Sequence, residues 1–200
     1  MANSLLSGLS LGKCMAVATC AGAAVFAVVA HPVAAQSSGR AVVQPVPPPG
    51  ADKLNSALRR LARNPSNQGA LIDAGRASLE VGDVEAARGF FERVLALSPS
   101  NTEAKLGLAS AAVRSEDPFT ALKLFDEAQA AGGNTRRYAA DRGLAFDLIG
   151  DSTRAQEFYR EAMRLGPTPE VRRRLALSQA ISGDTRGAEA TLLPLLQGQD

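Results

Sequence analysis

Cysteine and histidine are almost absent from this chain, and the few that occur lie near its start. The 200 residues contain two cysteines, Cys14 and Cys20, and one histidine, His31. From residue 36 onward there is neither, which excludes a disulfide, a thiolate nucleophile, an imidazole base and a Cys/His zinc site. We therefore expect no metal, no cofactor and no small-molecule substrate.

An excess of charge of either sign is also missing. The formal net charge is +2, with 22 basic and 20 acidic residues. The first 35 residues hold one base, Lys13, and no acid, so the remainder carries 21 bases against 20 acids, a net charge of +1. So small a charge cannot concentrate a polyanion, and we expect no nucleic-acid partner.

Residues 1–35 have the features of a secretory signal peptide. Lys13 precedes an apolar run, Met15–Ala30, and small residues lie before the polar sequence that starts at Gln36. This order favours cleavage between Ala35 and Gln36. The alternative is an uncleaved anchor, but the run is shorter than the roughly 20 residues that span a bilayer. A lipid on Cys20 is disfavoured, because the apolar run continues beyond it. We expect an exported protein, periplasmic or associated with an outer membrane.

Residues 36–50 form a proline-rich segment that we interpret as an extended, semi-stiff linker. A ligand for SH3-type domains is the alternative. Residues 51–67 contain one predicted helix, with Leu54, Leu58 and Leu61 at helical spacing. We interpret it as a partial repeat or N-terminal capping helix.

A period of 34 residues organises residues 68–200. Phe91, Phe125 and Tyr159 are spaced by this interval, and a fourth unit follows one residue early with Leu192. A fixed period of this length is typical of a helix–turn–helix solenoid. Each of the four units is predicted to contain two helices, over residues 68–81 and 84–97, 102–113 and 118–130, 135–149 and 152–165, and 169–181 and 185–196. Small residues let the paired helices approach, and rings four residues later fill the junction to the next unit; the small residues are Ala87, Ala121, Ala155 and Ala188.

Glycine and aspartate mark the turn between the paired helices. Gly takes the left-handed conformation that ends the first helix, and Asp caps the second. In the second unit Glu116 replaces the glycine, yet Asp117 remains and Pro118 follows at the first helical position. The glycine–aspartate pairs are Gly82–Asp83, Gly150–Asp151 and Gly183–Asp184.

These positions together resemble the tetratricopeptide repeat (TPR) over about residues 68–200. The resemblance implies an all-α, right-handed superhelical solenoid that binds other proteins without catalysis. The first unit carries the pattern at Leu71, Ala74, Gly75, Gly82, Ala87, Phe91, Val94 and Pro99, and the third at Ala139, Gly143, Phe146, Gly150, Ala155, Tyr159, Ala162 and Pro167.

The last two units are more particularly similar to the TadD-type proteins of Flp/Tad pilus assembly. The similarity lies in two segments, residues 141–151 and 174–184. It implies an accessory role in assembling the pilus or its outer-membrane secretin. The alternatives are a general envelope-biogenesis adaptor unrelated to pili, or a structural element that self-associates through the leucine-rich C-terminal helix.

The TPR resemblance places a partner-binding groove on the first helix of each unit. We expect Arg76, Arg114, Arg137 and Arg173 to anchor carboxylates of the partner. The carboxylate clamp of chaperone-tail binders is not expected, since its Lys and Asn positions carry Ile72 and Arg76. The other predicted groove residues are Ile72, Leu79, Leu106, Ser110, Val113, Leu144, Asp147, Leu148, Leu177 and Ile181.

Overall fold

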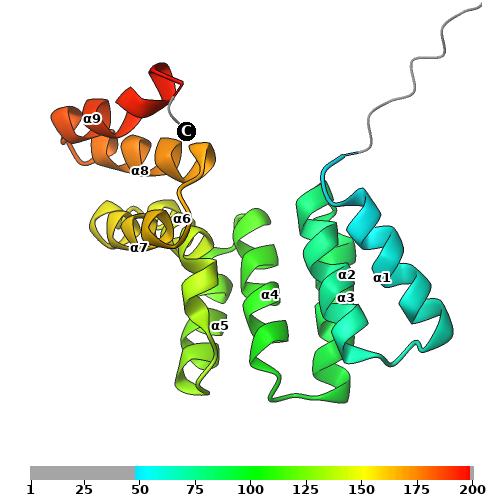
Figure 1. Ribbon diagram of the computed structural model, residues 1–200. Helices are drawn as coiled ribbons and strands as arrows, with labels where there is room; N and C mark the ends of the chain where they lie inside the picture. Colours follow the sequence, from blue (N-terminus) through cyan, green and yellow to red (C-terminus); the bar gives the residue numbers. More distant parts are fainter. Residues whose placement is uncertain (1–47, 199–200) are drawn as a thin grey trace, which may run out of the picture. The chain divides into compact units, whose positions relative to one another are not determined.

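The computed structural model describes residues 48–198, and within them every regular element is helical (Figure 1). The predicted signal peptide and most of the predicted linker lie outside these residues. The helices are α1 (Ala51–Arg63), α2 (Gln68–Val81), α3 (Val84–Leu97), α4 (Thr102–Arg114), α5 (Pro118–Ala130), the 3₁₀ helix η1 (Thr135–Tyr138), α6 (Ala139–Leu148), α7 (Ser152–Leu165), α8 (Pro169–Ile181) and α9 (Thr185–Leu196). The predicted all-α class is confirmed.

The predicted turn chemistry is confirmed as well. The Asp83 side chain accepts a hydrogen bond from the Ala86 backbone N–H at 3.0 Å, and Asp117, Asp151 and Asp184 cap their helices in the same way. Gly82 has φ 86°, in the left-handed region. Glu116 occupies the equivalent position of the second repeat with φ 58°, a conformation that costs a residue with a Cβ some strain.

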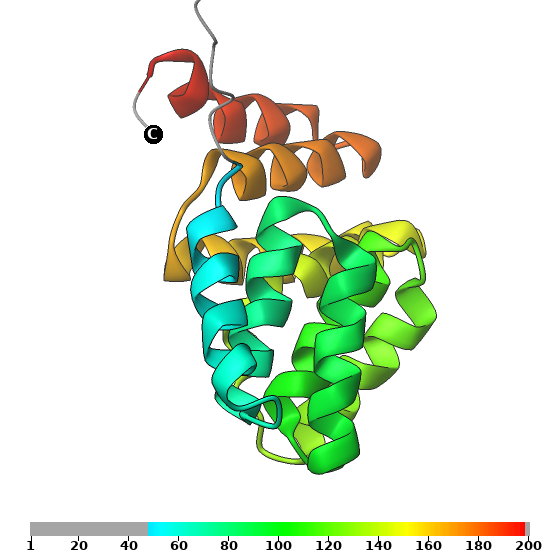
Figure 2. The same ribbon diagram turned by 90° about the vertical axis from the view of Figure 1, so that its right-hand side faces the viewer.

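Helices pack in chain order, so that each repeat is an α-hairpin stacked on the next. The pairs α2–α3, α4–α5, α6–α7 and α8–α9 form the hairpins, and α3–α4 and α7–α8 pack across the junctions. The first helices of the hairpins, α2, α4, α6 and α8, also contact one another in series (Figure 2). We call these four the A helices. The opening helix α1 packs on α2.

A phenylalanine ring fills the junction between the first two repeats. Phe91 is completely buried. Its ring lies so close to Gly75 of α2 and Gly107 of α4 that a Cβ at either position would overlap it. Two glycines therefore make room for one ring, which packs against its own repeat and the next one. This confirms the predicted role of the periodic aromatic position.

The same arrangement recurs further along the chain. Phe125 and Tyr159 are completely buried, as are the in-phase Ala121 and Ala155. A Cβ added to Gly143 would lie 2.8 Å from the edge of the Tyr159 ring, which is too close for a normal contact. Close backbone approach at a small residue is thus the repeated packing rule of the array.

One predicted helix is divided. Residues 135–149 were expected to form a single helix, whereas the structure has η1 followed by α6. The Asn134 side chain accepts from the Arg136 backbone N–H at 3.3 Å, which favours a tight 3₁₀ turn. Tyr138 then leaves helical geometry, with φ −105° and ψ 14°, and its hydroxyl reaches Glu103 of α4. A long-range hydrogen bond therefore accompanies the break.

No helix within residues 48–198 has both the length and the apolar character to cross a membrane.

Candidate protein-binding face

The predicted groove residues lie on the A helices and in η1, but four of them are buried. Leu79, Leu106, Ser110 and Val113 are between 0% and 8% exposed. Leu79 packs in one buried cluster of apolar side chains, and Leu106 and Val113 pack in another. They belong to the core, and we remove them from the candidate surface. The remaining predicted residues form what we call the A-helix face: Ile72, Arg76, Arg114, Arg137, Leu144, Asp147, Leu148, Arg173, Leu177 and Ile181.

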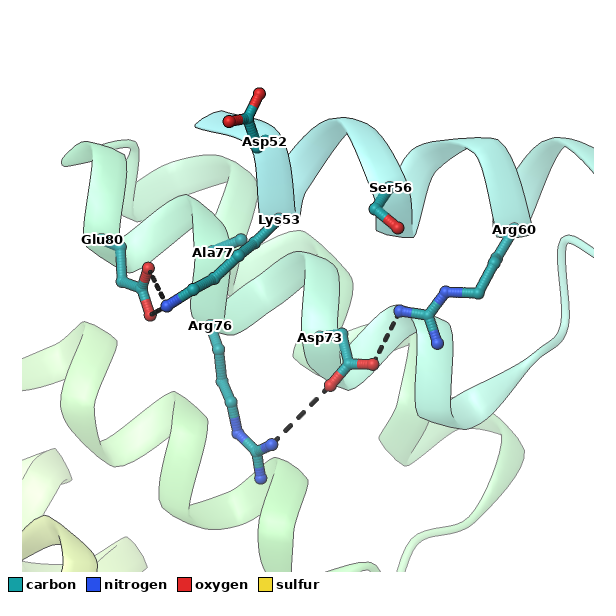
Figure 3. Close-up of a pocket in the computed structure, with 8 residues that line it drawn as sticks. All are labelled: Asp52, Lys53, Ser56, Arg60, Asp73, Arg76, Ala77 and Glu80. Atoms are coloured by element: carbon teal, nitrogen blue, oxygen red, sulfur yellow. Dashed lines mark hydrogen bonds and ion pairs between the residues drawn. The ribbon is translucent and has the colours of Figure 1, made fainter. Parts of the chain in front are cut away.

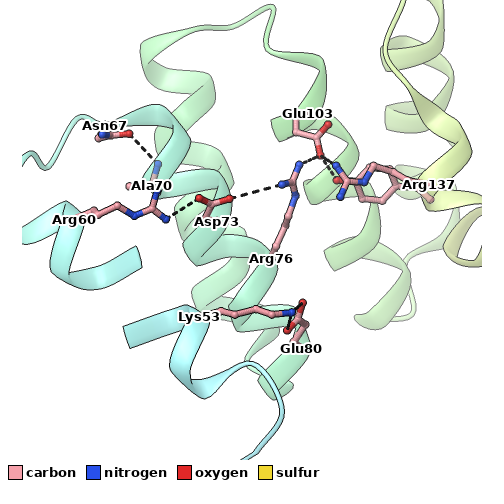
Figure 4. A network of polar contacts seen from close by, with 10 residues as sticks. Lys53, Arg60, Asn67, Ala70, Asp73, Arg76, Glu80, Glu103 and Arg137 are labelled. Atoms are coloured by element: carbon pink, nitrogen blue, oxygen red, sulfur yellow. Dashed lines mark hydrogen bonds and ion pairs between the residues drawn. The ribbon is translucent and has the colours of Figure 1, made fainter. Parts of the chain in front are cut away.

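Two of the arginines on this face, Arg76 and Arg137, are paired within the protein. The Arg76 guanidinium donates to the Glu103 carboxylate of α4. The Tyr138 hydroxyl donates to the same carboxylate at 2.5 Å, and Arg137 lies 3.4 Å from it (Figure 4). Glu103 thus collects three donors from two separate elements. Arg76 and Arg137, expected to hold a partner's carboxylate, already hold one of the protein's own.

The contacts of this network shift the pKa values of Glu103 and Tyr138. Burial alone would raise the pKa of the Glu103 carboxyl, but hydrogen bonds from Tyr138 and Arg76 outweigh burial and bring that pKa below its usual value. Burial, together with the bond to the Glu103 carboxylate, raises the pKa of Tyr138 to about 12. Each shift favours the form present at neutral pH, a carboxylate beside a protonated phenol.

A hollow of about 540 Å³ continues the charged region between α1 and α2 (Figure 3). Its charges also occur in pairs. Lys53 contacts Glu80 at 2.9 Å, and Arg60 contacts Asp73 at 2.7 Å. Asp73 lies 3.7 Å from Arg76, which joins this hollow to the Glu103 network. Sequence reasoning missed the contribution of α1, although Asp52, Ser56 and Arg60 are spaced by four residues and so share one face.

Arg173, in the last repeat, is paired too. Its guanidinium lies 3.4 Å from Glu170, which also contacts Arg174 at 2.8 Å. Arg114, the last residue of α4, differs from the other three candidate anchors. It is exposed, and its guanidinium has neither a hydrogen bond nor an ion pair within residues 48–198.

Arg114 borders a second hollow, of about 370 Å³, formed by α4, α6 and α8. The acids in this hollow are engaged: Asp141 accepts from Ser110, and Glu170 contacts Arg174. The other lining residues are apolar: Ala140, Leu144 and Val171. The hollow therefore combines apolar residues and engaged charges with one cation, Arg114, that has no partner within the described residues.

The last two repeats expose apolar side chains on the A-helix face. Leu148 is 43% exposed, Leu177 63% and Ile181 67%. Leu144 is half-buried one turn before Leu148 on α6. Asp147 accepts from the Ser178 hydroxyl at 2.7 Å and so helps to join α6 to α8. The predicted groove thus exposes mainly apolar side chains in its C-terminal half, whereas its N-terminal half is charged and, apart from Arg114, paired internally.

No cluster of three or more Cys, His, Asp or Glu side chains suited to a metal ion occurs in the described part of the chain. The shifted pKa values of Arg76, Glu103, Tyr138 and Tyr159 arise from burial and from hydrogen bonds or charges within the repeats. These shifts therefore have a structural explanation and do not by themselves indicate a reactive site.

Comparisons with known proteins agree with this architecture. Two sequence models of the tetratricopeptide repeat match, over residues 51–102 and 78–140. A search of the curated proteins found no match.

Solved structures of similar fold include TTC0263, a thermophilic TPR protein of Thermus thermophilus, with 24% identity and a TM-score of 0.60 over 72% of this chain and 80% of that one. MamA of Desulfovibrio magneticus RS-1 has 19% identity and a TM-score of 0.56, covering 74% of this chain and 84% of its own. YrrB, described as a TPR protein with an unusual peptide-binding site, has 20% identity and a TM-score of 0.55, covering 74% and 76%.

Identities this low establish the fold alone. Solenoids of this kind use the surface of their stacked repeats to bind other proteins. Residues 51–140 match tetratricopeptide repeats, and residues 48–198 have the fold of a TPR solenoid.

Proposed function

We propose that this chain is a non-catalytic scaffold of the bacterial cell envelope that binds a segment of a partner protein on its A-helix face. In the more specific form of the proposal, the chain is an accessory factor for Flp/Tad pilus or secretin assembly. The resemblance of residues 141–151 and 174–184 to TadD-type proteins supports that form. The signal-peptide-like start supports export to the periplasm or the outer membrane.

One observation carries the binding proposal, namely the exposure of Leu148, Leu177 and Ile181 on α6 and α8. They lie at positions where the first two repeats carry polar side chains. Adjacent exposed aliphatic side chains of this kind mark interaction sites more often than ordinary surface. The peptide-binding site named for YrrB, which shares the fold, is consistent with such a use.

Site-specific photo-crosslinking in cells that naturally express the chain tests the proposal. A benzophenone amino acid replaces Leu177 in one variant. In the matched control it replaces Phe119, an apolar residue 74% exposed on α5, outside the A helices. We expect the probe at Leu177, but not the one at Phe119, to form one dominant adduct, which mass spectrometry identifies as a pilus or secretin component.

Each other outcome has a definite meaning. An adduct specific to Leu177 with a protein of another envelope pathway contradicts the pilus assignment and keeps the scaffold. Equal labelling from both positions, or none from either, contradicts binding on the A-helix face.

Self-association is a second candidate, favoured by one observation on α9. Leu193 and Leu196 of this helix are 49% and 82% exposed. Burying them against a second copy would remove apolar surface from water. Light scattering decides this: a dimer or larger species that L193S and L196S together convert to a monomer supports self-association, and a monomer at all concentrations contradicts it.

A further inference from the structure

We propose that Arg114 anchors an acidic side chain at one end of an amphipathic helix of the partner, whose apolar face packs between α6 and α8. This inference rests on the proposed function, because it names the chemistry of the segment that the A-helix face binds.

Arg114 differs from the other three candidate anchors because its charge is unpaired within the described residues. Arg76 and Arg137 contact Glu103, and Arg173 contacts Glu170. A partner carboxylate would have to displace an internal acid to reach any of these three. At Arg114 no such exchange is needed, since its guanidinium has no partner within the described residues.

The surroundings of Arg114 favour an acid over a base. The two carboxylates of the shared hollow, Asp141 and Glu170, are already bonded by Ser110 and Arg174. Within the described residues, Arg114 is thus the one charged side chain of this hollow that has no hydrogen bond or ion pair. A carboxylate placed beside Arg114 accepts up to two parallel N–H bonds from the guanidinium, a geometry that a lysine could not offer.

The apolar residues next to this hollow indicate a helical ligand. Leu144 and Leu148 are four residues apart on α6, and Leu177 and Ile181 are four residues apart on α8. Each pair makes a short ridge along its helix, and the two helices are in contact. A furrow between two such ridges accepts the ridge of a third helix. Leu144 belongs both to this furrow and to the hollow of Arg114, so the anchor lies at the furrow's end.

The acidic residue of the ligand should accordingly lie about one turn from one end of its apolar contacts. The partner is thus defined by leucine-like residues at spacings of three and four, with an acidic residue at one end of them. A basic residue at that position is disfavoured, because it would lie beside the Arg114 guanidinium.

Peptide selection with the full-length chain tests this inference. The probe is a phage-displayed library of 16-residue peptides with an alanine-rich helical frame, randomised at positions of one helix face. The library is selected in parallel on the wild type, on R114E and on R164E. Arg164 is a matched control. It too is exposed and has no partner within residues 48–198, and it lies in the last turn of α7, which is not an A helix.

We expect the wild type and R164E to enrich the same peptides, with an Asp or Glu one turn from one end of an apolar stripe. R114E should instead enrich peptides with Lys or Arg at that position. In fluorescence anisotropy, the best wild-type peptide should bind R114E about 10-fold more weakly or worse, and a Glu→Lys peptide should recover binding to R114E. Circular dichroism of R114E confirms that the variant is folded.

The failures of the two proposals are distinguishable. Peptides that lose binding to L177D but bind R114E as well as the wild type overturn the role of Arg114 and keep the proposed function. Peptides that bind equally to L177D, or the absence of any enriched peptide, overturn both.

Discussion

Equivalent positions of the A helices have opposite chemistry in the first two and the last two repeats. One row of equivalent positions reads Arg76, Ser110, Leu144 and Leu177 along the array, and a second reads Glu80, Arg114, Leu148 and Ile181. The N-terminal members make ion pairs and hydrogen bonds between helices, apart from Arg114. The C-terminal members are apolar, and three of the four are exposed. The fold thus fixes the position of these side chains, while the choice of residue decides whether they stabilise the array or remain available for a ligand.

The largest loss of stability is expected when the junction between the first two repeats, in the N-terminal half, is disrupted. We expect G107L to destabilise the protein by about 3 kcal/mol, because the new side chain would occupy the space of the Phe91 ring. Urea denaturation followed by far-UV circular dichroism measures the change, and hydrogen exchange locates it in α2–α4.

G89A is the control for that substitution. Gly89 lies in α3, and a Cβ there meets open space, so G89A should stabilise the helix by about 0.5 to 1 kcal/mol. An equal loss of exchange protection across all four repeats in G107L would show that the two halves do not behave separately.

A smaller effect is expected when the charge network is opened. E103Q keeps the shape of the side chain but removes the charge that Arg76 and Arg137 share, and we expect a loss of about 2 kcal/mol, since these groups are partly exposed. L177S, in the apolar half, should change the free energy of unfolding by less than about 0.5 kcal/mol. Comparable losses in the two variants, measured by urea denaturation, would contradict the view that the N-terminal half stabilises the array while the C-terminal half remains available for a ligand.

The smallest effect concerns alkaline pH. The folded-state pKa of Tyr138 is about 12, above the ordinary value of 10.0. Between these values the unfolded chain releases the phenolic proton and the folded chain keeps it, so rising pH favours unfolding. We expect Tyr138 to contribute a loss of about 1 kcal/mol near pH 11, which Y138F removes. The control is Y159F in the C-terminal half: burial also raises the pKa of Tyr159, so this residue adds a loss of its own as the pH rises above 10.0, and Y159F should remove that part while keeping the part due to Tyr138. A Y138F profile identical to that of the wild type would contradict the role of Glu103.

Much of the fold could be predicted from the sequence because its signals are local or strictly periodic. The Asp caps and the left-handed glycines act within four residues, and the predicted ranges of α2, α3, α5, α7, α8 and α9 agree with the structure. The division of η1 from α6 was missed because it involves Tyr138 and Glu103, which are 35 residues apart.

The candidate site was predicted less completely, for a related reason. Register places a residue on a helix face, but burial depends on how closely the next A helix packs. Leu106 and Val113 have the register of a groove residue and the burial of a core residue. Likewise, nothing in the local sequence indicates that Arg76 meets Glu103, so the distinction between Arg114 and the other arginines emerges only in three dimensions.

The Phe91 ring belongs to two repeats at once, and this limits how the array can be edited. If a transplanted repeat carried a larger residue in place of the glycine that faces the ring, the side chain of that residue would clash with the ring. Duplication or shuffling of such repeats is therefore tolerated only when the ring and the glycine that faces it are both retained. The unit that must be kept intact in this protein is therefore the junction between two hairpins, not the single hairpin.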